Sequence, residues 1–568
     1  MGPTRPISRQ TDKGGMHYGI AQGTPKSDTT RLHLPAPPPN VIPIVFIPGV
    51  MGSNLKAVKE IKLNGAILAK AGKPVWNVNS STSAAGWTLK NPAERQMLLN
   101  KDVLTVDDRG DIALKTFGRG VRRTAQSMLP LELAQARGWG TVSWAFYGPF
   151  LDWLHHQLNN PMIVGGEPND VLAQLLALDG KTPPGAAHRP AALAKDQIRK
   201  LMKYQFPVWA VGYNWLQSNL DSGKDVLKII NEKIIPDARK NNHRCEQVIL
   251  VTHSMGGLVA RAVAKQAGNA VLGVVHGVQP LDGAAAFYKR LAAGFASEGG
   301  GIKGWIQSLA LGSTARDTTP VIAYAPGPLE LAPNQRYNGG KPWLFVRDTH
   351  GKILKALPQS GDPYKEIYAD SQSAWRAINP EWLNPAGISG KGLVDYAKTV
   401  KVAKGYHTQL GGYVHPQTYA HYSNDTGHKA WGTVTWSAES GAVYQPTPLQ
   451  IGLGVWPVPR WLPGQPRPLA APATWRLTQT PTDSERFAHD AHGALKMNLL
   501  PAAEPGDGTV PASASAGQVG TLAGCQIACG HSPGYEHSAS YALGEPHSSA
   551  VQHTVLDAVI RLTGHSVI

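Results

Sequence analysis

Four short stretches of the chain consist mainly of apolar residues, many of them β-branched: Val41–Ile47, Val208–Val211, Gln247–Thr252 and Val271–Val278. Runs of this length and composition are typical of strands that are buried on both faces of a sheet. Each run ends in a turn or leads directly into a helical pattern. Strands that alternate with helices in this way predict a parallel sheet built from right-handed crossovers.

Helical patterns follow two of these strands and close the chain. One begins after Asp221, which can cap it, and another begins directly after Gly257. A third repeats apolar residues at Val551, Val555 and Val559. The last strand and helix of the sheet are therefore expected near the end of the chain.

Two long stretches, residues 53–205 and 284–498, do not follow the alternation and are rich in Trp, Pro, Gly and Tyr. We expect them to be insertions that cap the carboxyl edge of the sheet, where ligands of such folds bind. Residues 1–40 end in a proline-rich run and are expected to form a flexible arm. The core of the fold then comprises residues 41–52, 206–283 and 499–568.

A candidate nucleophile lies between the third strand and its helix, in Thr252-His253-Ser254-Met255-Gly256. This context is typical of the nucleophile turn of α/β-hydrolases, where a sharp turn exposes a strained serine. The first position of that pattern is usually glycine and is Thr252 here. The doubled Gly256-Gly257 favours close packing on the other side of the turn, so Ser254 is the predicted nucleophile.

A serine hydroxyl needs a base to accept its proton, and the base needs a carboxylate to orient it. In this fold the acid and the histidine follow the serine along the chain. Asp507 lies in a glycine-flanked turn and is the predicted acid. His537, on a loop before the final helix, is the predicted base, and His547 is the alternative.

The oxyanion of a tetrahedral intermediate needs two preorganised donors. One is expected to be the backbone N–H of Met255, directly after the nucleophile. The other is expected from the loop that follows the first strand, where Val50 is the best candidate.

The composition is that of a globular protein, with 42% hydrophobic and 17% charged residues. Lys and Arg outnumber Asp and Glu by 55 to 39, which gives a formal net charge of +16 and favours anionic partners. The positive residues are spread along the chain, without a polybasic run or a nucleic-acid-binding motif. An anionic membrane surface is therefore a candidate partner, and nucleic acid is not.

The three cysteines, Cys245, Cys525 and Cys529, are too few for a disulfide framework. Cys525, Cys529 and His531 resemble half of a metal site, but no second pair of ligands is evident and zinc takes four. No metal or other cofactor is expected. The sequence shows neither an apolar N-terminal signal nor a run of about 20 apolar residues of the kind that spans a membrane.

Three of these segments, Ile44–Leu55, Val248–Arg261 and Gly506–Pro511, together resemble the lipase superfamily that includes lecithin:cholesterol acyltransferase and the GPI inositol-deacylase-like esterases. Two further segments, Pro207–Asn219 and His415–Tyr422, are similar to bacterial type VI secretion lipase effectors. The resemblance covers most of the chain after Val41. It implies an α/β-hydrolase fold with a mostly parallel central sheet and large cap insertions.

The resemblance also implies a function: hydrolysis of membrane phospholipid esters by a toxin that attacks rival cells. It implies a cognate immunity protein, a secretion spike as carrier, synthesis in a bacterial cytoplasm without a cleaved signal, and delivery to the periplasm of target cells. The cap would then carry a lid, for which Gly294–Leu311 is a candidate because some of its apolar residues recur at helical spacing.

Two other functions stay open at this level. An acyltransferase or a general carboxylesterase would use the same fold and the same serine. A non-catalytic binding or adaptor protein would keep the fold without the chemistry, although the retained order of serine, acid and histidine argues against it.

Overall fold

A computed structural model describes most of the chain. The described residues are 4–6, 9–11, 17–19, 31–33, 38–79, 86–114, 129–161, 169–177, 193, 195–295, 312, 314–373, 375–443, 476–479, 485–490, 493–514, 525–531, 534–545 and 547–566.

A six-stranded sheet lies at the centre of the fold, and every neighbouring pair of its strands is parallel. In spatial order its strands are β13 (Val208–Ala210), β6 (Ile44–Ile47), β14 (Val248–His253), β15 (Val271–Gly277), β18 (Thr418–Ser423) and β25 (Cys525–His531). All residues of β6, β14 and β15 are buried. Uniform burial explains why these strands appear in the sequence as continuous apolar runs.

The four predicted strands are present, with one change at the first. Val41–Ile47 is divided into β5 (Asn40–Val41) and β6, and the break falls at Ile42 and Pro43. Proline lacks the N–H that a central strand would donate, so it separates the two pieces. β5 pairs with β12 (Tyr204–Gln205), outside the main sheet.

Helices cover both faces of the sheet. On one face, α7 (Asn219–Ile229) and α9 (Gly256–Gln266) pack in the same apolar cluster as Val45 and Leu250. On the other face, α4 (Trp144–Asn159) and α17 (Ser548–Gly564) share a second cluster with Phe46 and Val251. The π-helical turn Ile230–Ile234 and α8 (Ile235–Ala238) continue α7.

The model differs from the predicted organisation at two places. α4 belongs to the segment expected to be the first cap insertion, yet it packs on the sheet, and α6 (Lys195–Leu201) lies against α17. β18 belongs to the segment expected to be the second insertion, yet it is a strand of the central sheet. The rest of the predicted boundaries stay predictions.

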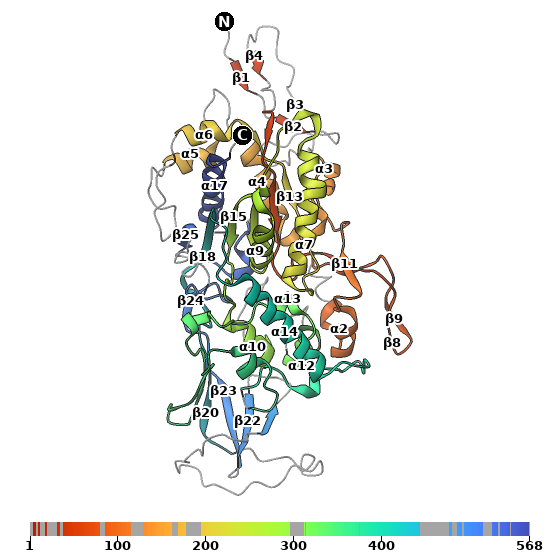
Figure 1. Cartoon of the computed structure of the whole chain (residues 1–568), viewed down its shortest axis with the longest axis vertical. Helices are drawn as coiled ribbons and strands as arrows, with labels where there is room; N and C mark the ends of the chain where they lie inside the picture. Colours follow the sequence, from red (N-terminus) through yellow and green to blue (C-terminus); the bar gives the residue numbers. More distant parts are fainter. Residues whose placement is uncertain are drawn as a thin grey trace.

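In Figure 1, α3 (Leu131–Ala136) and α5 (Asp170–Ala177) of the first insertion also lie in the upper part of the molecule, whereas other elements of the two insertions lie beyond the carboxyl ends of the parallel strands, in the lower half. The first contributes β7 (Leu55–Ala57), β8 (Ile61–Leu63), β9 (Ala66–Ala69), β10 (Pro74–Trp76), α2 (Pro92–Leu98) and β11 (Leu104–Val106). The second contributes α10 (Ala285–Ala293), α12 (Ala315–Ile322), α13 (Pro326–Leu329) and α14 (Leu393–Leu410).

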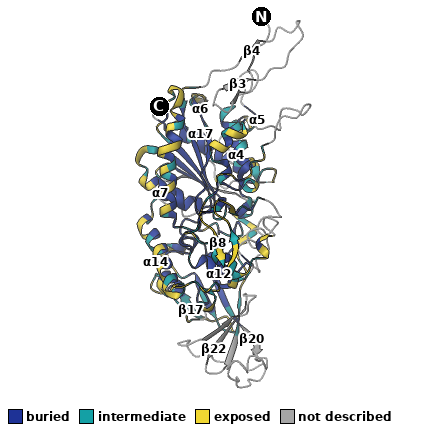
Figure 2. Cartoon of the chain, turned by 90° about the vertical axis from the view of Figure 1, so that its right-hand side faces the viewer, coloured by how far each residue is buried: buried dark blue, intermediate teal, exposed yellow. Residues whose placement is uncertain are grey.

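The second insertion also forms a mixed six-stranded sheet of its own at the far end of the molecule (Figure 1). In spatial order its strands are β17 (Ile353–Leu357), β16 (Leu344–Arg347), β20 (Val434–Val443), β23 (Gly493–Leu499), β22 (Glu485–Asp490) and β21 (Arg476–Gln479). Figure 2 shows the buried strands of the central sheet in the upper half of the molecule and exposed residues on the outer sides of α7 and α14.

Three sequence predictions fall partly or wholly outside what the model describes. The segment expected to be a flexible arm contributes β1 (Thr4–Pro6), which pairs with β4 (Arg31–His33), and β2 (Arg9–Thr11), which pairs with β3 (His17–Gly19). Residues 296–311 of the candidate lid lie outside the described residues, as do the side chains of Cys525, Cys529 and His531. Among the described helices, none has the length and apolar character needed to cross a bilayer.

Candidate active site

Ser254 occupies the corner between β14 and α9. Its φ of 52° lies in the left-handed region, which costs a residue with a Cβ on the order of 1–2 kcal/mol. The backbone N–H of Ser254 donates to the carbonyl of Gly277 at 2.8 Å, which ties the corner to the end of the neighbouring strand. The sharp turn predicted from the sequence is present, and it directs the serine side chain out of the sheet edge.

Two glycines let the corner approach the loop after β6. A Cβ at Gly256 would lie 2.4 Å from the carbonyl oxygen of Ile47, and a Cβ at Gly49 would lie 2.6 Å from Nδ1 of His253. Neither distance leaves room for a side chain. Thr252, at the position where the pattern usually has glycine, is accommodated because its hydroxyl is buried and bonds to Nδ1 of His276 at 3.0 Å.

Three predicted residues from distant parts of the chain form one line of hydrogen bonds. Nε2 of His537 lies 2.7 Å from Oγ of Ser254, and Nδ1 of His537 lies 2.7 Å from Oδ2 of Asp507. The other carboxylate oxygen of Asp507 accepts from the backbone N–H groups of Thr509 and Val510 at 2.9 and 2.6 Å. With Nδ1–H donated to the carboxylate, Nε2 is free of a proton and can accept one from the serine.

The surroundings of this line strengthen its hydrogen bonds. Asp507 is 1% exposed, Ser254 4% and His537 6%. Removal from water lowers the local dielectric constant, so a charge on the imidazole interacts more strongly with the carboxylate than it would at the surface. The backbone N–H of His537 also donates to the carbonyl of Asp507 at 2.8 Å, which fixes the two loops to each other.

The alternative base, His547, lies elsewhere. It stands at the start of α17, where its Nε2 bonds to the carbonyl of Ala539 at 2.9 Å and its ring lies 4.8 Å from that of Tyr535. The model thus brings His537, and not His547, into hydrogen-bonding contact with Ser254.

A second histidine, His253, lies directly beside the line. Its Nε2 is 3.1 Å from the carbonyl of His537, and its Nδ1 is 2.9 Å from the hydroxyl of Tyr147. Burial, reinforced by the nearby His537, lowers the pKa of His253 to about 3, so the ring is neutral. Its Nε2–H therefore donates to the carbonyl, and its Nδ1 accepts from the phenol.

Tyr147 extends this contact to the loop after β6. Its hydroxyl accepts from the backbone N–H of Gly49 at 3.2 Å, and burial raises the pKa of Tyr147, which keeps the phenol protonated. The sequence analysis missed both partners. His253 stands within the nucleophile motif and could have been noticed there, whereas Tyr147 lies more than a hundred residues upstream on α4 and carries no local signal.

The two predicted oxyanion donors flank the serine. Met255 is the first residue after Ser254 and has helical dihedral angles, and Val50 belongs to the loop after β6. Two side chains fix that loop by hydrogen bonds to its backbone. Nε1 of Trp76 donates to the carbonyl of Met51 at 2.8 Å, and the hydroxyl of Tyr213 donates to the carbonyl of Pro48 at 3.0 Å. The roles of Val50 and Met255 as donors stay predictions.

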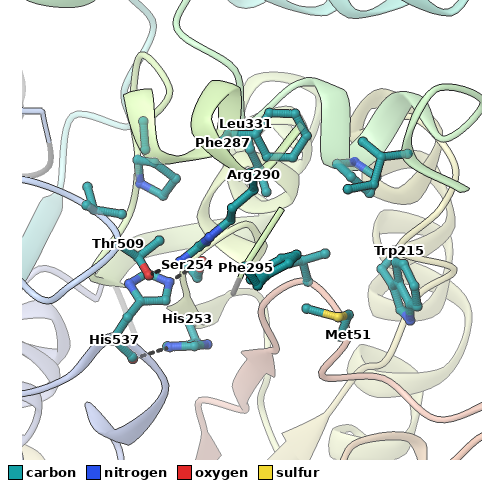
Figure 3. A pocket seen from close by; sticks show the side chains of 16 residues that line it. Met51, Trp215, His253, Ser254, Phe287, Arg290, Phe295, Leu331, Thr509 and His537 are labelled. Atoms are coloured by element: carbon teal, nitrogen blue, oxygen red, sulfur yellow. Dashed lines mark hydrogen bonds between the residues drawn. The ribbon is translucent and has the colours of Figure 1, made fainter. Parts of the chain in front are cut away.

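Ser254 and His537 line a largely apolar pocket. Figure 3 shows the side chains around it, including Phe287, Phe295, Trp215 and Met51, with Arg290 extending towards Ser254 and Thr509. The pocket lies between the carboxyl ends of the parallel strands and helices of the second insertion. Such an apolar lining suits an aliphatic chain.

The described residues contain no group of three or more His, Cys, Asp or Glu side chains that could hold a metal ion. The predicted absence of a cofactor stays a prediction, because the side chains of Cys525, Cys529 and His531 are outside this description.

The chain is similar to a solved structure over nearly its whole length. No protein-family model and no curated protein matches the sequence. A chain in the crystal structure of the Tle4–Tli4 complex is 27% identical to this one, with a TM-score of 0.68, and the match covers 92% of this chain and 98% of that chain. The parallel sheet, the serine at its strand-to-helix corner and this similarity agree: the protein has the α/β-hydrolase fold that the sequence predicts.

Proposed function

We propose that the protein hydrolyses carboxylic esters of membrane phospholipids, with Ser254 as nucleophile, His537 as general base and Asp507 as the acid that orients it. The observation that carries the proposal is the pair of 2.7 Å hydrogen bonds that joins these three side chains at the floor of an apolar pocket. A serine, an imidazole and a carboxylate in this arrangement are the minimum for acyl transfer through a serine ester.

The first half of the reaction forms an acyl-enzyme. Oγ of Ser254 attacks the ester carbonyl while Nε2 of His537 takes its proton, and the carboxylate of Asp507 stabilises the imidazolium. The negative charge on the carbonyl oxygen is received by the backbone N–H groups of Met255 and Val50. When the intermediate collapses, His537 returns the proton to the departing alcohol oxygen, and the acyl group remains on Ser254.

The second half releases the acyl group. His537 takes a proton from a water molecule, whose oxygen attacks the serine ester. The resulting intermediate expels Oγ of Ser254, which takes the proton back from His537. The products are a fatty acid, an alcohol-bearing lipid fragment and the regenerated serine. The apolar side chains of the pocket hold the acyl chain through both steps and exclude bulk water.

Assignment to phospholipid and to antibacterial secretion rests on resemblance. The segments similar to type VI secretion lipase effectors and the likeness to a chain of the Tle4–Tli4 complex support the same proposal. A cognate immunity protein that blocks the toxin, transport on a secretion spike and action in the periplasm of a target cell are parts of it. The positive net charge of +16 favours approach to anionic lipid surfaces.

The test compares wild type with Ser254→Ala on mixed bacterial phospholipids and identifies the products by mass spectrometry. Wild type is expected to release fatty acid and lysophospholipid, and Ser254→Ala neither. Ser513→Ala is the matched control, because Ser513 is exposed and bonds to Glu504 outside the pocket. Product release by Ser254→Ala at the wild-type rate would refute the proposal.

The alternatives are separated by small extensions of this test. An acyltransferase would transfer the acyl group to an added alcohol, and a lipid ester would accumulate in place of fatty acid. A non-catalytic adaptor would leave all phospholipids intact with both proteins.

A further inference from the structure

β18 lies between β15 and β25 in the central sheet (Figure 1). The chemistry proposed above gives no role to its polar side chains, although His421 and Ser423 are each only 1% exposed. The two residues are two positions apart on the strand, so their side chains project from the same face of the sheet. On that face they bond to the loop that carries the proposed base and to the loop that carries the proposed acid.

His421 contacts the loop of His537 at two points. Its Nδ1 lies 2.8 Å from the hydroxyl of Tyr535, and its Nε2 lies 3.1 Å from the hydroxyl of Tyr541. These buried tyrosines stand two residues before and four residues after His537. One imidazole of the sheet therefore bridges both ends of the segment that carries the base.

The same hydrogen bonds reach the strand that carries the nucleophile. The hydroxyl of Tyr541 donates its proton to the carbonyl of Thr252 at 3.0 Å, two residues before Ser254, because a carbonyl oxygen can only accept. Nε2–H of His421 therefore donates to the oxygen of Tyr541. Gly277 leaves room for this contact, since a Cβ there would lie 2.5 Å from the Tyr541 hydroxyl and 2.7 Å from Nε2 of His421.

Ser423 joins the loop of the acid to the loop of the base. Its hydroxyl donates to the carbonyl of Gly506 at 2.6 Å and accepts from the backbone N–H of Tyr535 at 3.1 Å. Gly506 directly precedes Asp507. A Cβ at Gly534 would clash with Oγ of Ser423, so the close approach of the base loop depends on that glycine.

We propose that His421 and Ser423 are positioning residues for the His537 ring, which they align through buried hydrogen bonds to the loops of the acid and the base. This inference rests on the proposed function and adds the part of the fold that aligns its base. Both residues act through the loops and not on the reacting atoms. A displacement of about 1 Å in a catalytic group can cost about a hundredfold in rate, so loss of these bonds should lower kcat.

A purely structural role predicts a different result. Loss of the hydrogen bonds of any buried histidine lowers the free energy of unfolding, but it leaves the kcat of the folded protein unchanged. A positioning role lowers kcat and kcat/KM by similar factors, because the alignment of the base matters in the transition state.

The kinetic test measures hydrolysis of 4-nitrophenyl butyrate, a soluble ester, at a temperature at which every variant is folded. His421→Phe is expected to lower kcat about tenfold to hundredfold, with KM changed less than about threefold. His421→Gln is expected to recover part of this loss, because its amide supplies one donor and one acceptor.

His407→Phe is the matched control. His407 is a buried histidine of α14 that bonds to the side chain of Asn334 and to the carbonyl of Glu330. Its replacement removes two buried hydrogen bonds, as His421→Phe does, and is expected to lower the free energy of unfolding without lowering kcat.

Two smaller substitutions keep the inference testable if His421→Phe does not fold. Tyr541→Phe and Ser423→Ala each remove one hydroxyl, and each is expected to lower kcat about tenfold. The loss in the double variant His421→Gln, Tyr541→Phe is expected to be smaller than the product of the two single losses, because both changes remove the same contact.

An unchanged kcat in His421→Phe would overturn the inference, as would an unchanged kcat in both Tyr541→Phe and Ser423→Ala. An equal loss of kcat in His407→Phe would also overturn it, because the effect would then belong to any buried histidine. Wild type that is as inactive as Ser254→Ala would instead refute the proposed function, so the two failures are distinguishable.

Discussion

The two halves of the candidate site are built in different ways. The nucleophile half is a contiguous segment at the end of a buried strand, and the backbone of the sheet fixes its shape: Ser254 bonds to Gly277, and Gly256 packs on Ile47. The acid–base half consists of Asp507 and His537, which stand on separate loops and are held by side-chain hydrogen bonds. One half is therefore encoded locally, whereas the other depends on the folded chain.

A buried hydrogen bond also joins the halves beside the catalytic line. His253 is the last residue of β14, directly before the nucleophile, and its Nε2–H donates to the backbone carbonyl of His537. The hydroxyl of Tyr147 donates to Nδ1 on the other side of the His253 ring and accepts from the backbone N–H of Gly49. Substitutions in the acid–base half should mainly lower kcat. Substitutions in the nucleophile half should mainly disturb the backbone and lower the free energy of unfolding.

The largest effect is expected in the acid–base half. His537→Ala removes the base and should lower kcat about a millionfold, as loss of a single triad member does elsewhere, with little change in stability. His547→Ala is the matched control, because its ring bonds to Ala539 and does not contact Ser254. Rates are measured with a soluble ester. An inactive His547→Ala beside an active His537→Ala would contradict the assignment.

The next effect concerns pH and the nucleophile half. Burial lowers the pKa of His253 to about 3 and that of His276 to about 3, from an ordinary value of 6.5. Below pH 6.5 the unfolded chain thus binds protons that the folded chain does not, so the free energy of unfolding falls as the pH is lowered towards 3. The slope is at most about 1.4 kcal/mol per pH unit for each histidine.

Urea unfolding followed by tryptophan fluorescence at several pH values measures this slope. His276→Gln removes one of the two titrating groups and is expected to reduce the slope. A slope that is unchanged in His276→Gln would contradict the burial argument, because the two proteins differ in that titrating group.

Gly256→Ala tests the backbone fit of the corner. The added methyl group would lie 2.4 Å from the carbonyl of Ile47, which belongs to the backbone of a buried strand and cannot move freely. We expect a loss of about 1–3 kcal/mol in the free energy of unfolding, together with a loss of activity, because Ser254 shifts from the His537 ring. Chemical denaturation and ester hydrolysis are measured on the same preparation.

Gly405→Ala is the matched control for that substitution. Gly405 lies within α14 with open space at its Cβ position, so the same change should stabilise the protein by about 0.4–1 kcal/mol and leave activity unaltered. Equal effects of the two substitutions would show that the corner has no special backbone requirement.

The smallest effect is expected at the contact between the halves. Tyr147→Phe leaves Nδ1 of His253 and the N–H of Gly49 without their phenol partner, and should lower kcat about tenfold with little change in KM. Tyr396→Phe is the control, since that buried tyrosine bonds to Tyr368 in the cap and should affect stability without affecting kcat. An unchanged kcat in Tyr147→Phe would show that His253 does not position His537.

Some elements were not predictable from their own residues. β18 contains His421, which is 1% exposed and bonds to the hydroxyls of Tyr535 and Tyr541. The polar residues of β18 interrupt the apolar pattern that would identify a buried strand. The tyrosines that make burial of His421 possible lie more than a hundred residues away along the chain. The sequence likewise places α4 in an insertion. Its apolar face does not show which surface it covers, and only the folded structure shows that this surface is the central sheet.

Local sequence patterns are sufficient to predict four of the six central strands, the corner that carries Ser254 and the chain order of the candidate acid and base. These features depend on short-range patterns, namely apolar runs, glycines and turns, which act within a few residues. Only the tertiary structure decided which histidine meets Ser254, that Tyr147 and His253 stand beside it, and that Arg290 lines the pocket. Such contacts join loops and helices that are distant along the chain, and the folded core alone fixes the distances between them.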